Sequence, residues 1–258
     1  MTKIITYNLN GLRSSLKKGL GDWLNQNLAD IYCFQEIKTD KEILATIDFA
    51  PKGYELFSLP AEKKGYSGVS ILTKIKPKNI LYGCGNQLYD SEGRFIWLDF
   101  GTWKLLNVYV PSGTTGEIRQ KVKDEFMVYF TNYINEIKKT QPNLILVGDF
   151  NIAHQAVDIH NPVGNKKTSG FLPHEREWFG QFLETGFVDA FRHLNPDAKD
   201  CYTWWSTRAN ARANNKGWRI DYHLVSQPIA DKMKKVIIYP EVSFSDHCPS
   251  VLEINLEK

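Results

Sequence analysis

Short runs of apolar residues recur along the whole chain. They are rich in Ile, Val, Tyr, Phe and Trp, which favour β-strands, and they are bounded by Gly, Pro, Asn or Asp, which favour turns. The pattern therefore predicts about ten strands. The runs cover residues 3–7, 31–35, 54–59, 69–72, 95–100, 105–110, 144–147, 220–225, 236–239 and 250–256.

Stretches with helical periodicity separate some of these runs. Residues 116–139 carry apolar side chains at three- and four-residue steps, which predicts an amphipathic helix. Further helices are predicted at 16–28 and at 175–184, and the lysine-rich segment 232–235 is expected to lie on the solvated face of a helix. Strands interspersed with a few helices indicate two packed sheets covered by helices. Because no linker or repeat interrupts the chain, we expect one domain over residues 1–258.

Composition and charge narrow the class of protein. The 258 residues are 42% hydrophobic, and the net charge of +3 is too small for a histone-like, charge-driven binder. No apolar run approaches the roughly 20 residues of a membrane span, and the first residues turn polar too early for a secretory signal. The four cysteines stand far apart, which disfavours zinc ribbons and redox motifs. We therefore expect a cytoplasmic protein with reduced thiols and no membrane association.

Polar side chains stand at the ends of several predicted strands. Each has an ordinary interpretation on its own, as a turn cap, a solvated charge, a surface histidine or a core tyrosine. That interpretation would have to hold separately at six strand ends, so we favour a shared site at one rim of the sheets. The residues concerned are Asn8, Glu36, Tyr109, Asp149, Asn151, Asp221, Asp246 and His247.

This set of side chains predicts metal-assisted hydrolysis of a phosphoester. Its oxygen donors are hard ligands without an accompanying cysteine, which favours Mg²⁺, with Mn²⁺ as a substitute, over zinc. Such a metal polarises a phosphate, a carboxylate can orient the attacking water, and a charged histidine can bind the phosphate. The chain has no Walker A loop, no G-x-G-x-x-G and no G-x-S-x-G, so nucleotide binding and serine acyl transfer lack their usual signatures.

In these motifs the chain resembles the exonuclease III class of apurinic/apyrimidinic (AP) endonucleases, within the endonuclease/exonuclease/phosphatase superfamily that includes DNase I. The resemblance extends over essentially the whole chain and implies an α/β fold, a four-layered α/β sandwich of two mainly antiparallel sheets flanked by helices. The matching segments are Tyr7-Asn8-Leu9-Asn10-Gly11-Leu12-Arg13, Gln35-Glu36-Ile37-Lys38, Gly65-Tyr66-Ser67-Gly68-Val69, Tyr109-Val110-Pro111, Gly148-Asp149-Phe150-Asn151, Trp218-Arg219-Ile220-Asp221-Tyr222 and Ser245-Asp246-His247-Cys248-Pro249.

The resemblance also implies a role for each residue of the set. Glu36 would be the principal metal ligand, with Asn10 and Asp246 nearby, and Asp149 with Asn151 would form an alternative second metal site. Asp149 would activate or orient the attacking water, with Asn8 orienting Asp149. Asn151, His247 and Tyr109 would contact the scissile phosphate, and Asp221 would pair with His247.

The segment before Asp221 predicts contact with nucleic acid. It carries Arg208, Arg212, Lys216 and Arg219 without an acidic residue among them, and aromatic residues flank it. The alternative is a solvated basic loop beside core tryptophans. The resemblance makes Trp204 and Trp218 walls of a pocket for a flipped-out abasic sugar. Further DNA contacts are expected from Arg13, Lys17 or Lys18, Tyr66, Asn165, Lys166 and Lys167, together with Arg208.

The chain departs from the vertebrate AP endonucleases in three places. The loop 111–116 lacks their Asn and Arg, Arg208 stands where they insert a Met into the duplex, and their long N-terminal extension is missing. We therefore expect a compact enzyme of the bacterial type. These departures leave open the balance between endonuclease and exonuclease activity.

We accordingly expect a monomeric, Mg²⁺-dependent DNA-repair phosphodiesterase. It would cleave 5′ to abasic sites in duplex DNA to leave a 3′-hydroxyl, with 3′–5′ exonuclease activity that trims 3′ ends. One alternative is a superfamily phosphatase that acts on inositol phosphates or lipids, which would not explain the basic and aromatic segment. Another is a non-catalytic regulator that binds nucleic acid, which would have no use for the complete set of hard ligands.

Overall fold

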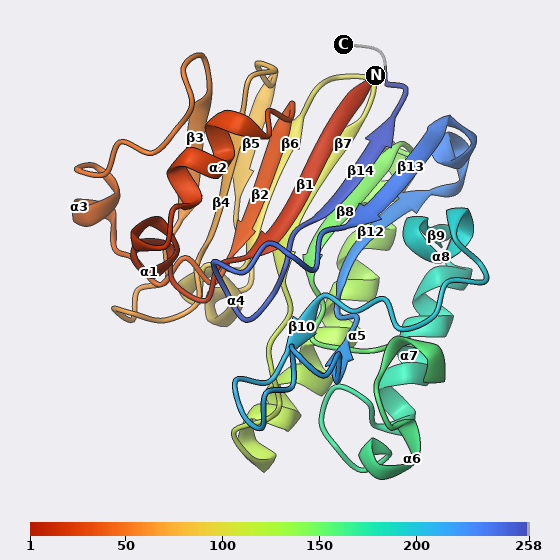
Figure 1. Ribbon diagram of the computed structural model, residues 1–258. Helices are drawn as coiled ribbons and strands as arrows, with labels where there is room; N and C mark the ends of the chain where they lie inside the picture. The colour runs from red at the N-terminus through yellow and green to blue at the C-terminus, as the bar shows by residue number, and fades with distance from the viewer. Residues whose placement is uncertain (257–258) are drawn as a thin grey trace.

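Two six-stranded sheets pack face to face in the computed structural model, which describes residues 1–256 (Figure 1). In the first sheet the neighbours pair antiparallel except β1 and β2, which run parallel. Its strands, in spatial order, are β13 (Met233–Ile238), β14 (Ser250–Ile254), β1 (Thr2–Asn8), β2 (Ile31–Gln35), β4 (Val69–Thr73) and β3 (Glu55–Leu59).

The second sheet repeats this pattern of pairing. Its two central strands, β7 and β8, run parallel and the other neighbours pair antiparallel. Its strands, in spatial order, are β5 (Asn79–Tyr82), β6 (Phe95–Asp99), β7 (Lys104–Tyr109), β8 (Leu144–Asp149), β12 (Asp221–Ser226) and β9 (Phe187–Asp189); the short pair β10 (Trp204–Trp205) and β11 (Gly217–Trp218) stands apart from both sheets.

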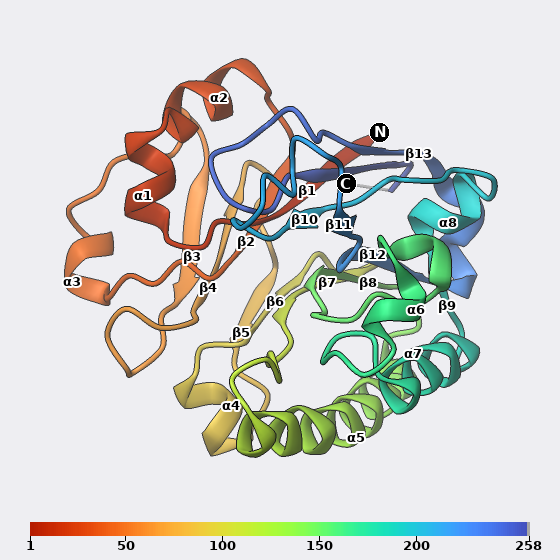
Figure 2. The same cartoon turned by 60° about the horizontal axis from the view of Figure 1, so that its bottom comes forward.

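Helices cover the outer faces of both sheets, which makes four layers (Figure 2). Leu12, Leu20 and Leu24 pack against the outward side chains of the first sheet, and Phe126, Phe130 and Phe179 pack against those of the second. The expected four-layered α/β sandwich is confirmed. The α-helices are α1 (Leu12–Lys17), α2 (Leu20–Gln26), α3 (Lys41–Leu44), α4 (Gln87–Ser91), α5 (Glu117–Thr140), α6 (Pro162–Asn165), α7 (Pro173–Glu184) and α8 (Ala190–Leu194), with 3₁₀ turns at Ala156–Asp158 and Gln227–Lys232.

Alternation along the strands divides the apolar side chains between an inner core and two outer ones. Ile4 packs between the sheets, whereas Ile5, its chain neighbour, packs beneath the helices of the first sheet. The inner core also takes Ile71 from the first sheet and Leu105 and Ile145 from the second. Because both faces of the central strands are buried, most of their residues are apolar, and this makes the strands easy to recognise in the sequence.

The structure corrects some of the predicted elements. All ten predicted strands are present, but β5, β9, β10 and β11 were missed because they are short or half exposed. The helix predicted at 16–28 is broken into α1 and α2 by Gly19, whose φ of 102° lies outside the helical range. The prediction of a helix around 232–235 is wrong, since residues 233–235 belong to strand β13. The last two residues of the expected domain, 257–258, lie outside the described residues.

The pairing register brings several strand ends to one rim. Asn8 lies opposite Gln35 in the parallel pair β1 and β2, and Tyr109 lies opposite Asp149 in the parallel pair β7 and β8. Strand β12 runs the other way, so its first residue, Asp221, also lies opposite Asp149. This close pairing requires Gly148, because a Cβ there would lie 1.8 Å from the carbonyl oxygen of Val108.

A histidine is buried between the sheets. His223 is 2% exposed, its Nε2 lies 3.2 Å from the carbonyl oxygen of Ile4, and its Nδ1 has no hydrogen-bond partner among the described residues. Burial lowers the pKa of His223 to about 3. The imidazole is therefore neutral in the folded protein at any pH near neutrality.

This burial predicts a specific sensitivity to acid. Below about pH 6.5 the unfolded chain binds a proton at His223 that the folded chain does not, so stability falls by about 1.4 kcal/mol per pH unit as the pH drops toward 3. Urea unfolding of His223→Leu between pH 7 and 4.5 should show a shallower loss of stability than the wild type. Replacing the exposed His160 by Leu is the control. Equal slopes for His223→Leu and the wild type would contradict the assignment.

Candidate active site

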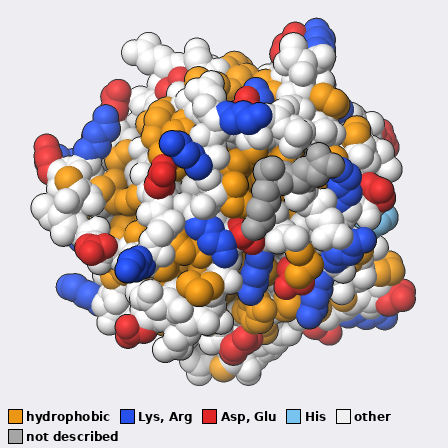
Figure 3. Space-filling model, turned by 90° about the horizontal axis from the view of Figure 1, so that it is seen from above, with side chains coloured by type: hydrophobic (Ala, Val, Ile, Leu, Met, Phe, Trp, Pro, Cys, Tyr) orange, Lys and Arg blue, Asp and Glu red, His pale blue; other side chains and the backbone are white. Residues whose placement is uncertain are grey.

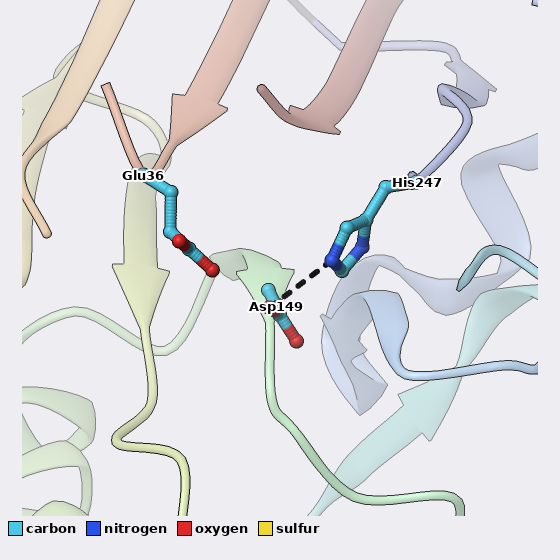
Figure 4. Close-up of side chains that lie close together, drawn as sticks. All are labelled: Glu36, Asp149 and His247. Carbon is cyan, nitrogen blue, oxygen red and sulfur yellow. Dashed lines mark ion pairs between the residues drawn. The ribbon is translucent and has the colours of Figure 1, made fainter. Parts of the chain in front are cut away.

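Three ionisable side chains from distant parts of the chain converge at this rim (Figure 4). Glu36 follows β2, Asp149 ends β8, and His247 comes from the loop before β14. Glu36 and His247 approach Asp149 from opposite sides, and His247 Nε2 lies 3.9 Å from Asp149 Oδ2. Asp149 is 1% exposed and His247 4% exposed, so their charges interact with little screening by water.

The amide of Asn8 joins the two carboxylates. Its Nδ2 donates to Glu36 Oε1 at 3.0 Å and to Asp149 Oδ2 at 2.8 Å, while its Oδ1 accepts from the backbone N–H of Asn10 at 2.9 Å. Asn8 is fully buried at the end of β1. All of its polar atoms are thus engaged, and the distance between Glu36 and Asp149 is fixed by a side chain that cannot rotate freely.

Glu36 is held as an anion. It accepts from the hydroxyl of Tyr109 at 2.6 Å, and Lys38 Nζ lies 2.7 Å from its Oε2. Burial alone would raise the pKa of Glu36, but the charge and the hydrogen bond of Lys38, with the hydrogen bonds of Tyr109 and Asn8, lower it below its usual value. Glu36 is therefore available as a hard anionic ligand at neutral pH.

The pKa of Asp149, unlike that of Glu36, is raised above its usual value. Burial is the main cause that raises its pKa, and the negative charges of Asp221 and Glu36 add to it, while His247 opposes them. The backbone N–H of Asn151 donates to Asp149 Oδ1 at 2.8 Å and fixes the carboxyl plane. A carboxyl group with a raised pKa binds a proton more strongly than an ordinary aspartate, which suits a group that accepts a proton from water.

His247 carries a positive charge. Its Nδ1 lies 2.9 Å from Asp221 Oδ2, the pairing that the resemblance implied. Burial would lower the pKa of His247, but the charge and hydrogen bond of Asp221, helped by Asp149 and Asp246, raise it to about 10. Its Nε2 faces Asp149 and the cleft, where an N–H donor can bind an anionic oxygen.

Two groups of side chains could hold a metal ion, and they share Glu36. In the first, ligand atoms of Glu36, Asp149 and His247 lie within 4.8 Å of one another. A protonated His247 has no lone pair to offer, which disfavours this group. In the second, Asn10 Nδ2 donates to Asp246 Oδ1 at 2.9 Å, and Lys38 Nζ contacts both Asn10 Oδ1 and Glu36 Oε2. Its carboxylate and amide oxygens fit a hard divalent cation.

The backbone around the site is strained. Asn10, Glu36 and Asn151 adopt φ values of 45°, 49° and 52°, in the left-handed region that residues other than glycine rarely occupy. Behind Asn151, the fully buried ion pair of Lys123 and Glu175 supports this turn, since Lys123 Nζ donates to the carbonyl oxygen of Asn151 at 2.8 Å. Strain of this kind persists where the surroundings hold the backbone in place.

A cleft of about 450 Å³ opens above these groups. Trp204 and Trp218 form an aromatic wall, with ring centroids 5.9 Å apart in an edge-to-face arrangement. Trp204 Nε1 donates to Asp246 Oδ2 at 3.0 Å, which ties this wall to the expected metal ligands. Tyr66 lies on the lining as well, with its ring near Lys63 and its hydroxyl 3.4 Å from Arg94 Nη2.

Sequence reasoning missed part of this lining. Arg94 and Arg119 both pair with Glu92, and Arg94 lies over the ring of Tyr109. No motif marks these residues, because their convergence depends on β6 and α5 meeting in space. Lys38 could have been found, since it stands in the Gln35-Glu36-Ile37-Lys38 segment. The missed residues that line the cleft are Lys38, Arg94, Ser112, Thr114, Thr115, Arg119, Thr168, Ser169 and Ile220.

The basic segment before Asp221 only partly faces solvent. Arg208 and Lys216 are exposed. Arg219 is 1% exposed and paired with Asp158 and Asp189, and Arg212 donates to backbone carbonyls of the segment 240–247. Of the four basic residues of the segment, these two arginines are thus engaged by groups of the protein itself. They brace Asp221 and the loop of His247 from behind.

The remaining predicted DNA contacts lie on the surface. Arg13, Lys17, Lys166 and Lys167 are exposed, whereas Lys18 donates to the carbonyl oxygen of Phe244 and the Asn165 amide donates to carbonyls of its own turn. At the end of the molecule where the amino terminus lies, acidic and basic side chains intermix over the described part of the face (Figure 3).

The charge of His247 gives a direct prediction. Asp221→Asn removes the negative charge that the buried imidazole depends on, so the pKa of His247 should fall by about 1–3 units or more. The measurement is an NMR titration of the His247 ring nitrogens, with the exposed His160 as an internal reference. A titration of His247 that is unchanged in Asp221→Asn would contradict the assigned pairing.

Comparisons with known proteins agree with this architecture. The chain is 41% identical over 255 residues to an exodeoxyribonuclease of Bacillus subtilis (strain 168), covering 98% of this chain and 100% of that protein. It is 40% identical over 252 residues to the DNA repair nuclease APEX1 of Danio rerio, covering 97% of this chain and 81% of that protein. Within residues 1–256 no helix is long and apolar enough to cross a membrane.

Solved structures are similar over nearly the whole fold. The 3′ phosphatase NExo from Neisseria, bound to a product DNA hairpin, has a TM-score of 0.89 and 27% identity, covering 99% of this chain and 100% of that one. The AP endonuclease LMAP from Leishmania major also has a TM-score of 0.89, with 29% identity, covering 99% of this chain and 88% of that one. The profile of the endonuclease/exonuclease/phosphatase family matches residues 5–247, and the chain belongs to this family.

Proposed function

We propose that the protein is a Mg²⁺-dependent DNA-repair phosphodiesterase that cleaves 5′ to abasic sites in duplex DNA and trims 3′ ends. One observation carries this proposal: the Asn8-bridged pair of Glu36 and Asp149 faces the His247 imidazolium at the bottom of a cleft with an aromatic wall. The relatives named exodeoxyribonuclease, DNA repair nuclease and AP endonuclease support DNA as the substrate.

The site residues would divide the reaction among them. The His247 imidazolium and the Asn151 amide bind the scissile phosphate, and Asp149 orients a water molecule and accepts its proton. The water oxygen attacks phosphorus, the bond from phosphorus to O3′ breaks, and the released O3′ takes a proton from solvent water to become a 3′-hydroxyl. A Mg²⁺ ion held by Glu36, with Asn10 and Asp246, would supply charge stabilisation at the phosphate and the leaving oxygen.

The walls of the cleft support an abasic substrate. Trp204, Trp218 and Ile220 offer an apolar surface to a sugar without a base, and such a residue is cheap to extrude because it leaves no base stacking behind. Exposed cations around the rim would bind the flanking phosphates. An inositol phosphate or lipid would make no use of this aromatic wall together with a rim suited to a polymer.

We further propose that residues 1–258 act as one domain and as a monomer. The shared core between the two sheets supports the single domain, and the site takes every one of its residues from one chain. A DNA-repair enzyme of the bacterial type would work in the cytoplasm, where the DNA lies.

Incision of a defined substrate tests the proposal. A duplex with one abasic site should be cut on its 5′ side with Mg²⁺ and left intact with EDTA. Glu36→Ala and Asp149→Asn should each lower kcat by about 10²–10⁴, the usual effect of losing a group that assists proton transfer or binds the metal. Glu42→Ala, an exposed glutamate on the neighbouring helix α3, is the matched control.

The same incision assay also distinguishes the proposed activity from the two alternatives. Metal-independent incision, or full activity in Asp149→Asn, would contradict the proposal. Turnover of inositol phosphates in preference to DNA by the same preparation would favour the phosphatase alternative, and DNA binding without cleavage under Mg²⁺ or Mn²⁺ would favour the regulator.

Two adjacent lysines, Lys166 and Lys167, are exposed next to Thr168 and Ser169, which line the cleft. If Lys166 and Lys167 contact phosphates, their joint replacement by Gln should weaken DNA binding irrespective of sequence and reduce the slope of log Kd against log salt by about 2. Fluorescence anisotropy in EDTA at several salt concentrations measures this slope. Lys234 and Lys235, exposed on β13, give the control pair. Equal slopes for both double variants would exclude a role of Lys166 and Lys167 in binding.

A further inference from the structure

Lys38 lies among the side chains expected to hold the metal. Its Nζ is 2.7 Å from Glu36 Oε2 and donates to Asn10 Oδ1, and Asn10 in turn donates to Asp246 at 2.9 Å. The ammonium group therefore contacts two of the three expected ligands directly and the third through Asn10. A protein cation already stands beside the oxygens that would bind a divalent ion.

The backbone fixes this position. Lys38 and Glu36 both adopt a φ of 49°, on either side of the fully buried Ile37. The N–H groups of Ile37 and Lys38 donate to the carbonyl oxygens of Gly68 and Ser67 at 3.2 and 2.9 Å. Two left-handed residues around one buried side chain direct Glu36 and Lys38 to the same place. Such a costly conformation is retained where the surrounding structure imposes it.

Lys38 differs in this respect from an ordinary surface lysine. Its side chain is 31% exposed and that of Glu36 is 16% exposed. Lys64, by comparison, is 78% exposed and reaches Asp40 and Glu42 only at 3.9 and 3.8 Å. Exposed pairs of the latter kind contribute little, whereas charges in the less solvated rim interact more strongly.

We propose that Lys38 is a resident counter-ion of the metal site, which holds Glu36 and Asn10 in place before a divalent cation binds and must move away when the cation arrives. The proposal rests on the assignment of Glu36, Asn10 and Asp246 as the metal ligands. Two cations close to the same oxygens repel each other, so Lys38 and a divalent cation compete for Glu36 and Asn10. Lys38 lines the open cleft, so its flexible side chain has space into which to move.

The counter-ion has opposite effects on the two states of the site. Without metal, its positive charge offsets that of the Glu36 carboxylate, which lies close to Asp149. With metal, it competes for Glu36 and Asn10 and weakens binding. A salt bridge of purely structural value would show the first effect only, so metal affinity distinguishes the two interpretations.

Mn²⁺ binding to the DNA-free protein tests the proposal, with free Mn²⁺ measured by electron paramagnetic resonance. Lys38→Met should bind Mn²⁺ on the order of tenfold more tightly than the wild type, which corresponds to about 1.4 kcal/mol. Its melting temperature in EDTA should be lower than that of the wild type and should recover more on addition of Mn²⁺. Lys64→Met should match the wild type in both measurements.

Two further variants make the result decisive. Lys38→Gln keeps a hydrogen-bond donor for Asn10 but no charge, and it should show the tighter binding even if Lys38→Met folds poorly in EDTA. Equal or weaker Mn²⁺ binding by Lys38→Gln would overturn the proposal. Mn²⁺ binding that is unaffected by Glu36→Gln would instead overturn the ligand assignment beneath it. Because neither result depends on DNA cleavage, a failure of the proposed nuclease activity is detected separately by the incision assay.

Discussion

The arrangement of the site is determined by the negative charge that gathers at one poorly solvated rim of the sheets. Glu36, Asp149, Asp221 and Asp246 meet there, and His247 and Lys38 are the cations in direct contact with them. Burying carboxylates without compensation is costly, so the remaining negative charge has to be met by a proton, a metal ion or a hydrogen bond. The amide of Asn8, the raised pKa of Asp149 and the fit of the rim to a hard cation all follow from this single requirement.

The two sheets keep these negatively charged side chains in place, because the strands that carry them are fixed by the rest of the fold. Each contributes a parallel central pair whose ends meet at the same edge, and β12 enters that edge from the other direction. Buried ion pairs then brace the ends from behind: Arg219 with Asp158 and Asp189 below Asp221, and Lys123 with Glu175 below Asn151. The strained turns at Glu36 and Asn151 are stable only within this frame.

Much of the fold and the composition of the site could be predicted from the sequence. Central strands such as 31–35 and 144–147 are apolar on both faces, and the polar residues that end them stand out clearly. Edge strand β5 was missed because it is largely exposed, and Gly19 broke a helix that periodicity alone had made continuous. The orientation of Arg212 and Arg219 could not be predicted, since a basic residue in sequence gives no sign of the buried partner it meets in space. The roles of the individual site residues stay predictions.

We propose that the excess negative charge at the rim is a binding site for a divalent cation coordinated by Glu36 and not by His247. A crystal structure of the protein soaked with Mn²⁺ tests it most directly, through the anomalous scattering of manganese. We expect one strong peak among the oxygens of Glu36, Asn10 and Asp246, with the Lys38 ammonium displaced toward the cleft. A peak bound to His247 and Asp149, with Lys38 still in contact with Glu36, would contradict it.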